Sequence, residues 1–102
     1  MNLRILDEAD KEFQEATLWY FKHSHRLGEL FAQSVHQSLL AIERDPLRFA
    51  PVEFAEVTPV CRRAMVARYP YVVIFQVLEI EVVVLSIVHT SRDPNRWIGR
   101  VQ

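Results

Sequence analysis

Two apolar runs in the second half of the chain restrict the folds that are open to it. Residues 71–77 read YVVIFQV and residues 82–89 read VVVLSIVH, and the polar break between them is at Glu79 to Glu81. β-branched and aromatic residues in runs of this length, separated by so short a break, predict the two strands of a hairpin. Residues 60–68, VCRRAMVAR, alternate in character and predict a third strand.

The first half of the chain has a helical period instead. After a short extended piece at residues 2–6, apolar residues recur at helical spacing over residues 9–20, and Asp7 is positioned to cap this first helix. Ser24 is positioned to cap a second helix, whose apolar stripe runs over residues 27–42. Two helices joined this tightly form an antiparallel hairpin.

Asp45-Pro46 ends the second helix, and residues 46–59 hold three prolines without a helical or alternating pattern. We expect this segment to run over the surface as a connection. The order strand, helix, helix, strand, strand, strand predicts an α+β fold, in which the helical hairpin packs on one face of a small antiparallel sheet. Residues 1–102 form one domain, because a second core could not bury enough apolar surface.

The last predicted strand has no polar face. Alternation places Val82, Val84 and Val88 on one face of the sheet, and Val83, Leu85 and Ile87 on the other. Since two helices cover only one face of a small sheet, part of the second face should remain exposed or be covered by something else. Either residues 46–59 or the carboxyl-terminal tail folds over it, or a partner chain lies across it.

Composition and charge exclude several classes of protein. The amino terminus turns acidic after six residues and no apolar run is long enough to span a bilayer, so we expect a cytosolic protein without a signal peptide or membrane contact. Residues 1–57 carry six Lys/Arg and ten Asp/Glu, whereas residues 58–102 carry six and three. The carboxyl half is therefore the side that can meet an acidic partner or a phosphate, although the formal net charge of -1 is not typical of an RNA-binding protein.

The sequence gives no reason to expect a metal or another cofactor. His23, His25 and His36 lack a further ligand at usable spacing, and the single Cys61 is interpreted as a small core residue. The carboxylates at the start of the first helix are interpreted as a solvated face that the helix dipole favours: Asp7, Glu8, Asp10, Glu12 and Glu15. A glycine-rich phosphate loop and a nucleophile-elbow serine are both absent from the sequence.

Arginine is the remaining chemical signal. Arg62 and Arg63 lie on opposite faces of the third predicted strand, Arg68 follows them, and the tail HTSRDPNRWIGR adds three more arginines beside a histidine and a tryptophan. Arginine binds phosphate or carboxylate through paired hydrogen bonds and histidine exchanges protons near neutral pH, so this set could bind RNA and assist its cleavage. Alternatively the tail closes the fold, with Trp97 over the sheet edge and Arg96 paired with helix carboxylates.

The ending of the chain and the order of its elements resemble a known family. The ending has the form H-x-x-R-x-P-x-x-W-x-x-R, with His89, Arg92, Pro94, Trp97 and Arg100 at those spacings. Together with the stretch RYPYVVIFQV and the apolar strand that follows it, this ending closely resembles the ParE branch of the RelE/ParE toxins. The resemblance covers the whole chain, because Trp19-Tyr20 in the helical hairpin and the Asp45-Pro46 stop also match.

The resemblance implies the toxin of a two-gene toxin–antitoxin system, of the kind that stabilises plasmids. Such a toxin is held inactive by an antitoxin, ParD-like or similar, whose carboxyl-terminal segment wraps the toxin surface. ParE-like members are similar in fold to RelE-type messenger-RNA interferases, but they are associated with poisoning DNA gyrase and lack the catalytic set. In this chain no lysine follows Lys22, and no tyrosine or histidine follows His89, which disfavours RNA cleavage.

The first hypothesis is therefore a non-enzymatic toxin that binds gyrase and uses no catalytic residue. One alternative is a RelE-like endoribonuclease that uses His89 with Arg62, Arg63 and Arg92; the other is an inert homologue that only binds its antitoxin. Direct contact with nucleic acid stays open. The residues expected to contact the target or the antitoxin are Arg62, Arg63, Arg68, Arg92, Arg96, Trp97, Arg100 and Trp19.

Overall fold

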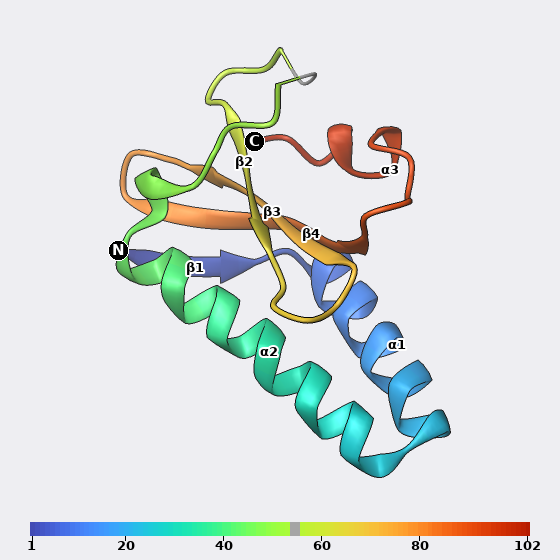
Figure 1. Ribbon diagram of the computed structural model, residues 1–102. Helices are drawn as coiled ribbons and strands as arrows, with labels where there is room; N and C mark the ends of the chain where they lie inside the picture. The colour runs from blue at the N-terminus through green and yellow to red at the C-terminus, as the bar shows by residue number, and fades with distance from the viewer. Residues whose placement is uncertain (54–55) are drawn as a thin grey trace.

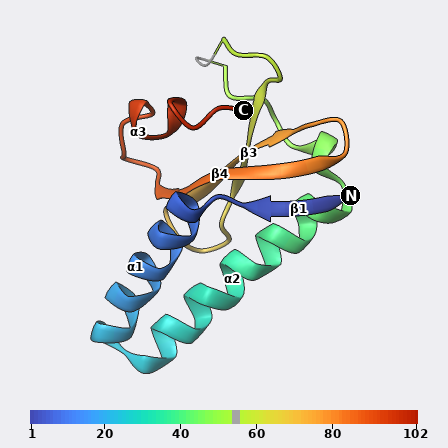
Figure 2. The same ribbon diagram turned by 180° about the vertical axis from the view of Figure 1, so that it is seen from behind.

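The computed structural model describes residues 1–53 and 56–102. Its elements are, in order, β1 (Asn2–Ile5), α1 (Asp7–His23), α2 (His25–Arg44), the 3-10 turn η1 (Pro46–Arg48), β2 (Cys61–Met65), β3 (Tyr71–Val77), β4 (Glu81–His89) and α3 (Asn95–Ile98) (Figure 1). The α1–α2 hairpin lies on one side of the sheet, and α3 lies on the other (Figures 1 and 2). This arrangement confirms the predicted α+β fold.

The four strands form one sheet in the order β1-β4-β3-β2. β2, β3 and β4 pair antiparallel, as the hairpin pattern predicts. β1 pairs parallel with β4, with Leu3 opposite Val82, so the sheet as a whole is mixed and the prediction of a purely antiparallel sheet is wrong in this detail. A parallel pair needs a long crossover, which here is the rest of the chain from α1 to β3.

The helical hairpin covers one face of this sheet with apolar side chains. Phe31 and Val35 of α2 are fully buried against Val73 and Phe75 of β3. Ser24 caps α2 as predicted, since its hydroxyl accepts a hydrogen bond of 3.3 Å from the amide of Leu27. The prediction that Asp7 caps α1 is wrong, because Asp7 is the first helical residue and Leu6 occupies the cap position without a side-chain bond. Among the described residues, no helix is long and apolar enough to cross a bilayer.

The close packing of the hairpin depends on Gly28, at the start of α2. A Cβ atom at this position would overlap the ring of Phe21 on α1. We therefore expect Gly28→Ala to lower the free energy of unfolding by about 1–2 kcal/mol, because the cost of the overlap exceeds the gain in helix propensity. Thermal unfolding followed by circular dichroism measures this change. Gly99→Ala is the matched control, since nothing lies within 4 Å of a Cβ there, and it should leave the melting temperature unchanged or slightly raised.

A β-bulge changes which side chains of β4 face the helices. Ile74 pairs with Ser86 and Phe75 pairs with Val84, so β4 carries one more residue than β3 at this point. Beyond the bulge the alternation is reversed, and Ile87 packs on the helix side while Val88 packs on the other side. The predicted faces are therefore correct up to Leu85 and wrong for Ile87 and Val88.

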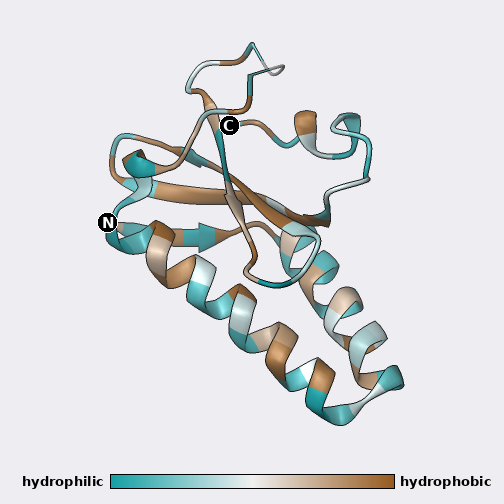
Figure 3. Ribbon diagram, viewed as in Figure 1, coloured by the Kyte–Doolittle hydropathy of each residue, from teal (hydrophilic) through white to brown (hydrophobic). Residues whose placement is uncertain are grey.

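The chain itself covers the second face of the sheet. Val52, from the connection after α2, and Trp97, from the tail, are both buried against the outer side chains of β3 and β4. Figure 3 shows both strands as hydrophobic along most of their length, with the tail segment across from them. Of the two explanations that the apolar strands allowed, the intramolecular cover is the one observed. The connection is accordingly more than a surface loop, since Pro51 also bridges to Arg62 of β2.

Gln76 joins these two covering segments to the sheet. Its side chain is fully buried, and its amide donates a hydrogen bond of 2.8 Å to the carbonyl of Pro59 in the connection. Its amide oxygen accepts a bond of 2.8 Å from the backbone amide of Gln102 in the tail. One polar residue in an apolar strand therefore fixes both covering segments.

Candidate functional site

Two arginines of the tail bind a buried carboxylate on α1. Arg96 donates to Glu12 with an Nε to Oε2 distance of 2.8 Å, and Arg100 donates to Glu12 through both terminal nitrogens at 2.8 and 3.3 Å. The Ser86 hydroxyl and the Ile87 amide of β4 donate to the same carboxylate at 2.9 and 3.3 Å. The tail is thus bonded to both α1 and β4, which confirms the pairing predicted for Arg96. Glu12 itself is buried, so its assignment to a solvated helix face is wrong.

The protonation of Glu12 reflects two opposing effects. Burial by itself raises the pKa of this carboxyl, but the hydrogen bonds from Arg100, Arg96 and Ser86 outweigh it and hold the pKa below the ordinary value of 4.5. Arg100 also donates to the carbonyl of Leu85 at 2.9 Å. Glu12, Arg96 and Arg100 therefore form ion pairs with one another inside the fold.

Two further candidates, Trp97 and Arg62, also make contacts that hold the fold together. Trp97 is 3% exposed and lies on the second face of the sheet rather than over an open edge. Arg62 donates a bond of 2.7 Å to the carbonyl of Phe49, which holds the connection after η1 against β2. These contacts explain why a short tail and one edge strand carry so many large polar and aromatic side chains.

Three of the candidate arginines remain available to a partner: Arg63, Arg68 and Arg92. All three are exposed, and their side chains form no hydrogen bond or ion pair with the described residues. Arg68 lies in the turn between β2 and β3 with a φ of 70°, a left-handed conformation that is uncommon for a residue other than glycine. The arginines thus divide into a set that holds the fold and a set that faces solvent.

Arg63 and Arg92 lie in one hollow on the second face of the sheet, which we call the His89 hollow. Its volume is about 220 Å³, and His89 and Thr90 line it together with the two arginines. No acidic residue lines it among the described residues. Arg62 does not line this hollow. In the register of β2 with β3, Arg62 is opposite Phe75, which is on the helix face of the sheet, and Arg63 is opposite Ile74, which is on the second face.

A second hollow, of about 540 Å³, lies on the other side of His89 and Arg92, between α1 and the end of β4. We call it the Trp19 hollow, because Trp19 of α1 is on its rim, 54% exposed. Tyr71 at the start of β3 lines it as well, with its ring 5.4 Å from that of His89. His89 and Arg92 line both hollows and therefore connect them.

Tyr71 is the residue of this region that the sequence did not single out. Burial raises the pKa of its hydroxyl above the ordinary value of 10.0, and the nearby charge of Arg92 opposes that rise. His89 accepts a bond of 3.1 Å at Nδ1 from the amide of Ser91, and the Ser91 hydroxyl lies 2.8 Å from the same atom. Tyr71 lies 18 positions before His89 in the chain, and only the antiparallel pairing of β3 with β4 brings the two residues opposite each other.

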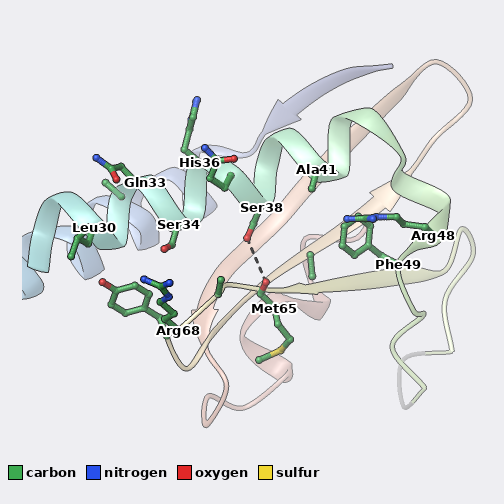
Figure 4. Close-up of a pocket in the computed structure, with 15 residues that line it drawn as sticks. Leu30, Gln33, Ser34, His36, Ser38, Ala41, Arg48, Phe49, Met65 and Arg68 are labelled. Carbon is green, nitrogen blue, oxygen red and sulfur yellow. Dashed lines mark hydrogen bonds between the residues drawn. The ribbon is translucent and has the colours of Figure 1, made fainter.

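A third hollow is a groove of about 800 Å³ between α2 and the edge strand β2 (Figure 4). Phe49, Met65 and Leu30 supply apolar surface, and the only direct bond drawn across it joins the Ser38 hydroxyl to the carbonyl of Met65 at 3.4 Å. The charged residues that line it are Arg48 and Arg68, and His36 also lines it. No carboxylate lines the groove among the described residues. The groove therefore combines an apolar floor with positive charge.

Comparison with known proteins identifies the family. The sequence model of the ParE toxin of the type II toxin–antitoxin system parDE matches residues 3–94. The chain belongs to the ParE toxin family. Among curated protein sequences none matches significantly. A solved structure described as the chromosomal ParDE toxin–antitoxin system from P. aeruginosa is similar to it, with a TM-score of 0.74 and 19% identity over 87% of this chain and 95% of that one.

The ParE-family fold brings together part of the alternative catalytic set. Arg63, His89 and Arg92 meet at the His89 hollow, whereas Arg62 is on the opposite face and is bonded to Phe49. His23, His25 and His36 do not meet in a metal site, and the described residues contain no cluster of three or more metal-ligating side chains. Cys61 is buried, and burial raises the pKa of its thiol above 9.0, so it is not an activated nucleophile.

Proposed function

We propose that this chain is a cytoplasmic toxin that inhibits DNA gyrase and is neutralised by a ParD-like antitoxin. The observation that carries the proposal is that the tail has a structural role. Arg96 and Arg100 neutralise the buried Glu12, and Trp97 covers the second face of the sheet. A tail used in this way holds the fold and leaves few groups for acid–base chemistry. Membership of the ParE toxin family supports the same function.

The groove between α2 and β2 supports an antitoxin as a partner. An amphipathic segment could bury apolar side chains against Phe49 and Met65 while its carboxylates meet Arg48 and Arg68. The absence of carboxylates among the described residues of the groove favours an acidic segment over a basic one. We expect the neighbouring reading frame to encode this antitoxin.

Induction of the chain without its antitoxin tests the proposed target. We expect filamentous growth and a DNA-damage response while translation continues, and inhibition or trapping of purified gyrase on supercoiled plasmid. His89→Ala should not abolish this effect, because the proposed function asks no proton transfer of His89. Co-expression with the antitoxin is the control and should restore growth.

RNA cleavage is the second candidate, and the meeting of His89, Arg63, Arg92 and Tyr71 favours it. These side chains could hold a phosphodiester and move a proton. If translation stops first, messenger RNA is cut, and His89→Ala abolishes the cutting, then the gyrase proposal is wrong and cleavage replaces it. If cells grow normally on induction without the antitoxin, and the purified chain still binds the antitoxin, then the chain is an inert homologue.

A further inference from the structure

Trp19 is exposed but held in a fixed orientation. Its ring meets Tyr20 edge to face at 5.0 Å, and the ring of His23 lies 4.2 Å from it on the next turn. His23 is itself fixed, since its Nδ1 lies 2.9 Å from the carbonyl of Trp19. A large aromatic side chain that is already ordered loses little entropy on binding, and tryptophan is one of the residues enriched among the side chains that dominate protein interfaces.

Taken together, the Trp19 and His89 hollows are lined by more arginines than carboxylates: Arg63, Arg92 and Arg96 against Glu12 and Glu15. In the Trp19 hollow the carboxylate of Glu12 is neutralised by Arg96 and Arg100, which leaves Glu15 as the other acid that lines it. Arg92 faces solvent without an internal partner, and Arg63 does the same in the adjoining His89 hollow. The two connected hollows therefore offer two unpaired guanidinium groups and a fixed indole to one ligand.

We propose that the Trp19 and His89 hollows together form the surface that binds the cellular target, and that the target presents a carboxylate next to an apolar side chain. The apolar side chain packs on Trp19 and Tyr71, and the carboxylate pairs with Arg92 and, for an extended segment, with Arg63. A protein segment fits better than nucleic acid, because Arg92 and Arg63 can pair with one or two carboxylates, whereas a nucleic acid carries a charge at every nucleotide and the net charge of this chain is -1.

This inference rests on the proposed function, in which the target is a protein, and it assigns that target a surface apart from the antitoxin groove. Among the described residues, the groove between α2 and β2 has no lining residue in common with the Trp19 hollow, and it shares only Met65 with the His89 hollow. Substitutions in the hollow should therefore weaken binding of the target and leave the antitoxin bound. A role in folding alone would not separate the two partners in this way.

Variants of the full-length chain test the surface by two measurements. We expect Trp19→Ala and Arg92→Ala each to weaken binding to purified gyrase by about 30-fold, the effect of removing a side chain that dominates an interface. Leu18→Ala and Arg44→Ala are matched controls, because Leu18 is 56% exposed beside Trp19, and neither lines the two hollows. Both controls should bind gyrase within about twofold of the native chain. Every variant should still co-purify with the antitoxin.

The outcomes separate the surface from the identity of the target. Native binding of gyrase by Trp19→Ala and Arg92→Ala would overturn the inference and leave the proposed function standing. If the native chain does not bind gyrase, then gyrase is not the target, and growth arrest on induction tests the proposed surface instead. Loss of growth arrest in Trp19→Ala and Arg92→Ala, but not in the controls, would support the surface. Growth arrest in these two variants would refute it. If the native chain binds a single-stranded DNA or RNA of 20 nucleotides and these variants lose that binding, then the surface binds nucleic acid and the inference is wrong.

Discussion

Replacing Glu12 by alanine is expected to lower the free energy of unfolding by about 3–5 kcal/mol, the usual cost of breaking a buried ion pair from one side. The side chain of Glu12 is 6% exposed and accepts bonds from Arg96, Arg100, Ser86 and the amide of Ile87. Its removal takes this acceptor from all four donors and leaves the partly buried Arg100 without its counter-charge, with only the carbonyl of Leu85 as a partner among the described residues. Urea unfolding followed by circular dichroism measures the loss.

Glu15→Ala is the matched control for this prediction. Glu15 is an exposed carboxylate on the same helix, and its loss should change the free energy of unfolding by less than about 0.5 kcal/mol. Equal effects of the two substitutions would show that the cluster around Glu12 contributes no more than a surface charge does.

The same cluster sets the direction of a pH dependence. Because the folded pKa of Glu12 lies below the unfolded value of 4.5, ionised Glu12 stabilises the fold fully above pH 4.5. This contribution is lost as the pH falls through the folded pKa. The native chain should therefore lose stability more steeply below pH 4.5 than Glu12→Ala does, and parallel curves would contradict the assignment.

The elements of the fold follow from periodicity, and their errors have local causes. The helical period and the β-branched runs predict both long helices and three strands, because each pattern extends over several turns or pairs. A strand as short as β1 carries no information on the direction of its partner, so its parallel pairing with β4 is not predictable. The bulge at Leu85 adds one residue without a signal in the sequence, and it exchanges the faces of Ile87 and Val88.

The candidate site was predicted as a group of residue types and resolved only by tertiary contacts. The sequence places several arginines near the end of the chain and allows Arg96 to pair with a helix carboxylate, but it does not indicate that this carboxylate is Glu12 or that Arg100 reaches it as well. Glu12 has the same local context as its exposed acidic neighbours, so burial cannot be inferred for it alone. The division between arginines that hold the fold and arginines that face solvent therefore required the structure.

Trp97→Ala is expected to lower the free energy of unfolding by about 3–5 kcal/mol, since removing a buried tryptophan leaves a large cavity. Trp97 is 3% exposed and packs with Val72, Leu85 and Val88 on the second face of the sheet. Its loss should also release the tail that carries Arg96 and Arg100, so the substitution and Glu12→Ala should not be additive. Chemical unfolding of the two single variants and the double variant measures both effects.

Trp19→Ala is the control that distinguishes a structural tryptophan from one that binds a partner. Because Trp19 is more than half exposed, its loss should change the free energy of unfolding by about 1 kcal/mol or less while it weakens target binding by about 30-fold. Trp97→Ala should do the opposite: the folded fraction should fall, and toxicity should fall only in proportion to it. If Trp97→Ala unfolds like the native chain and has still lost its toxicity, then Trp97 contacts the target and the tail is not what closes the second face of the sheet.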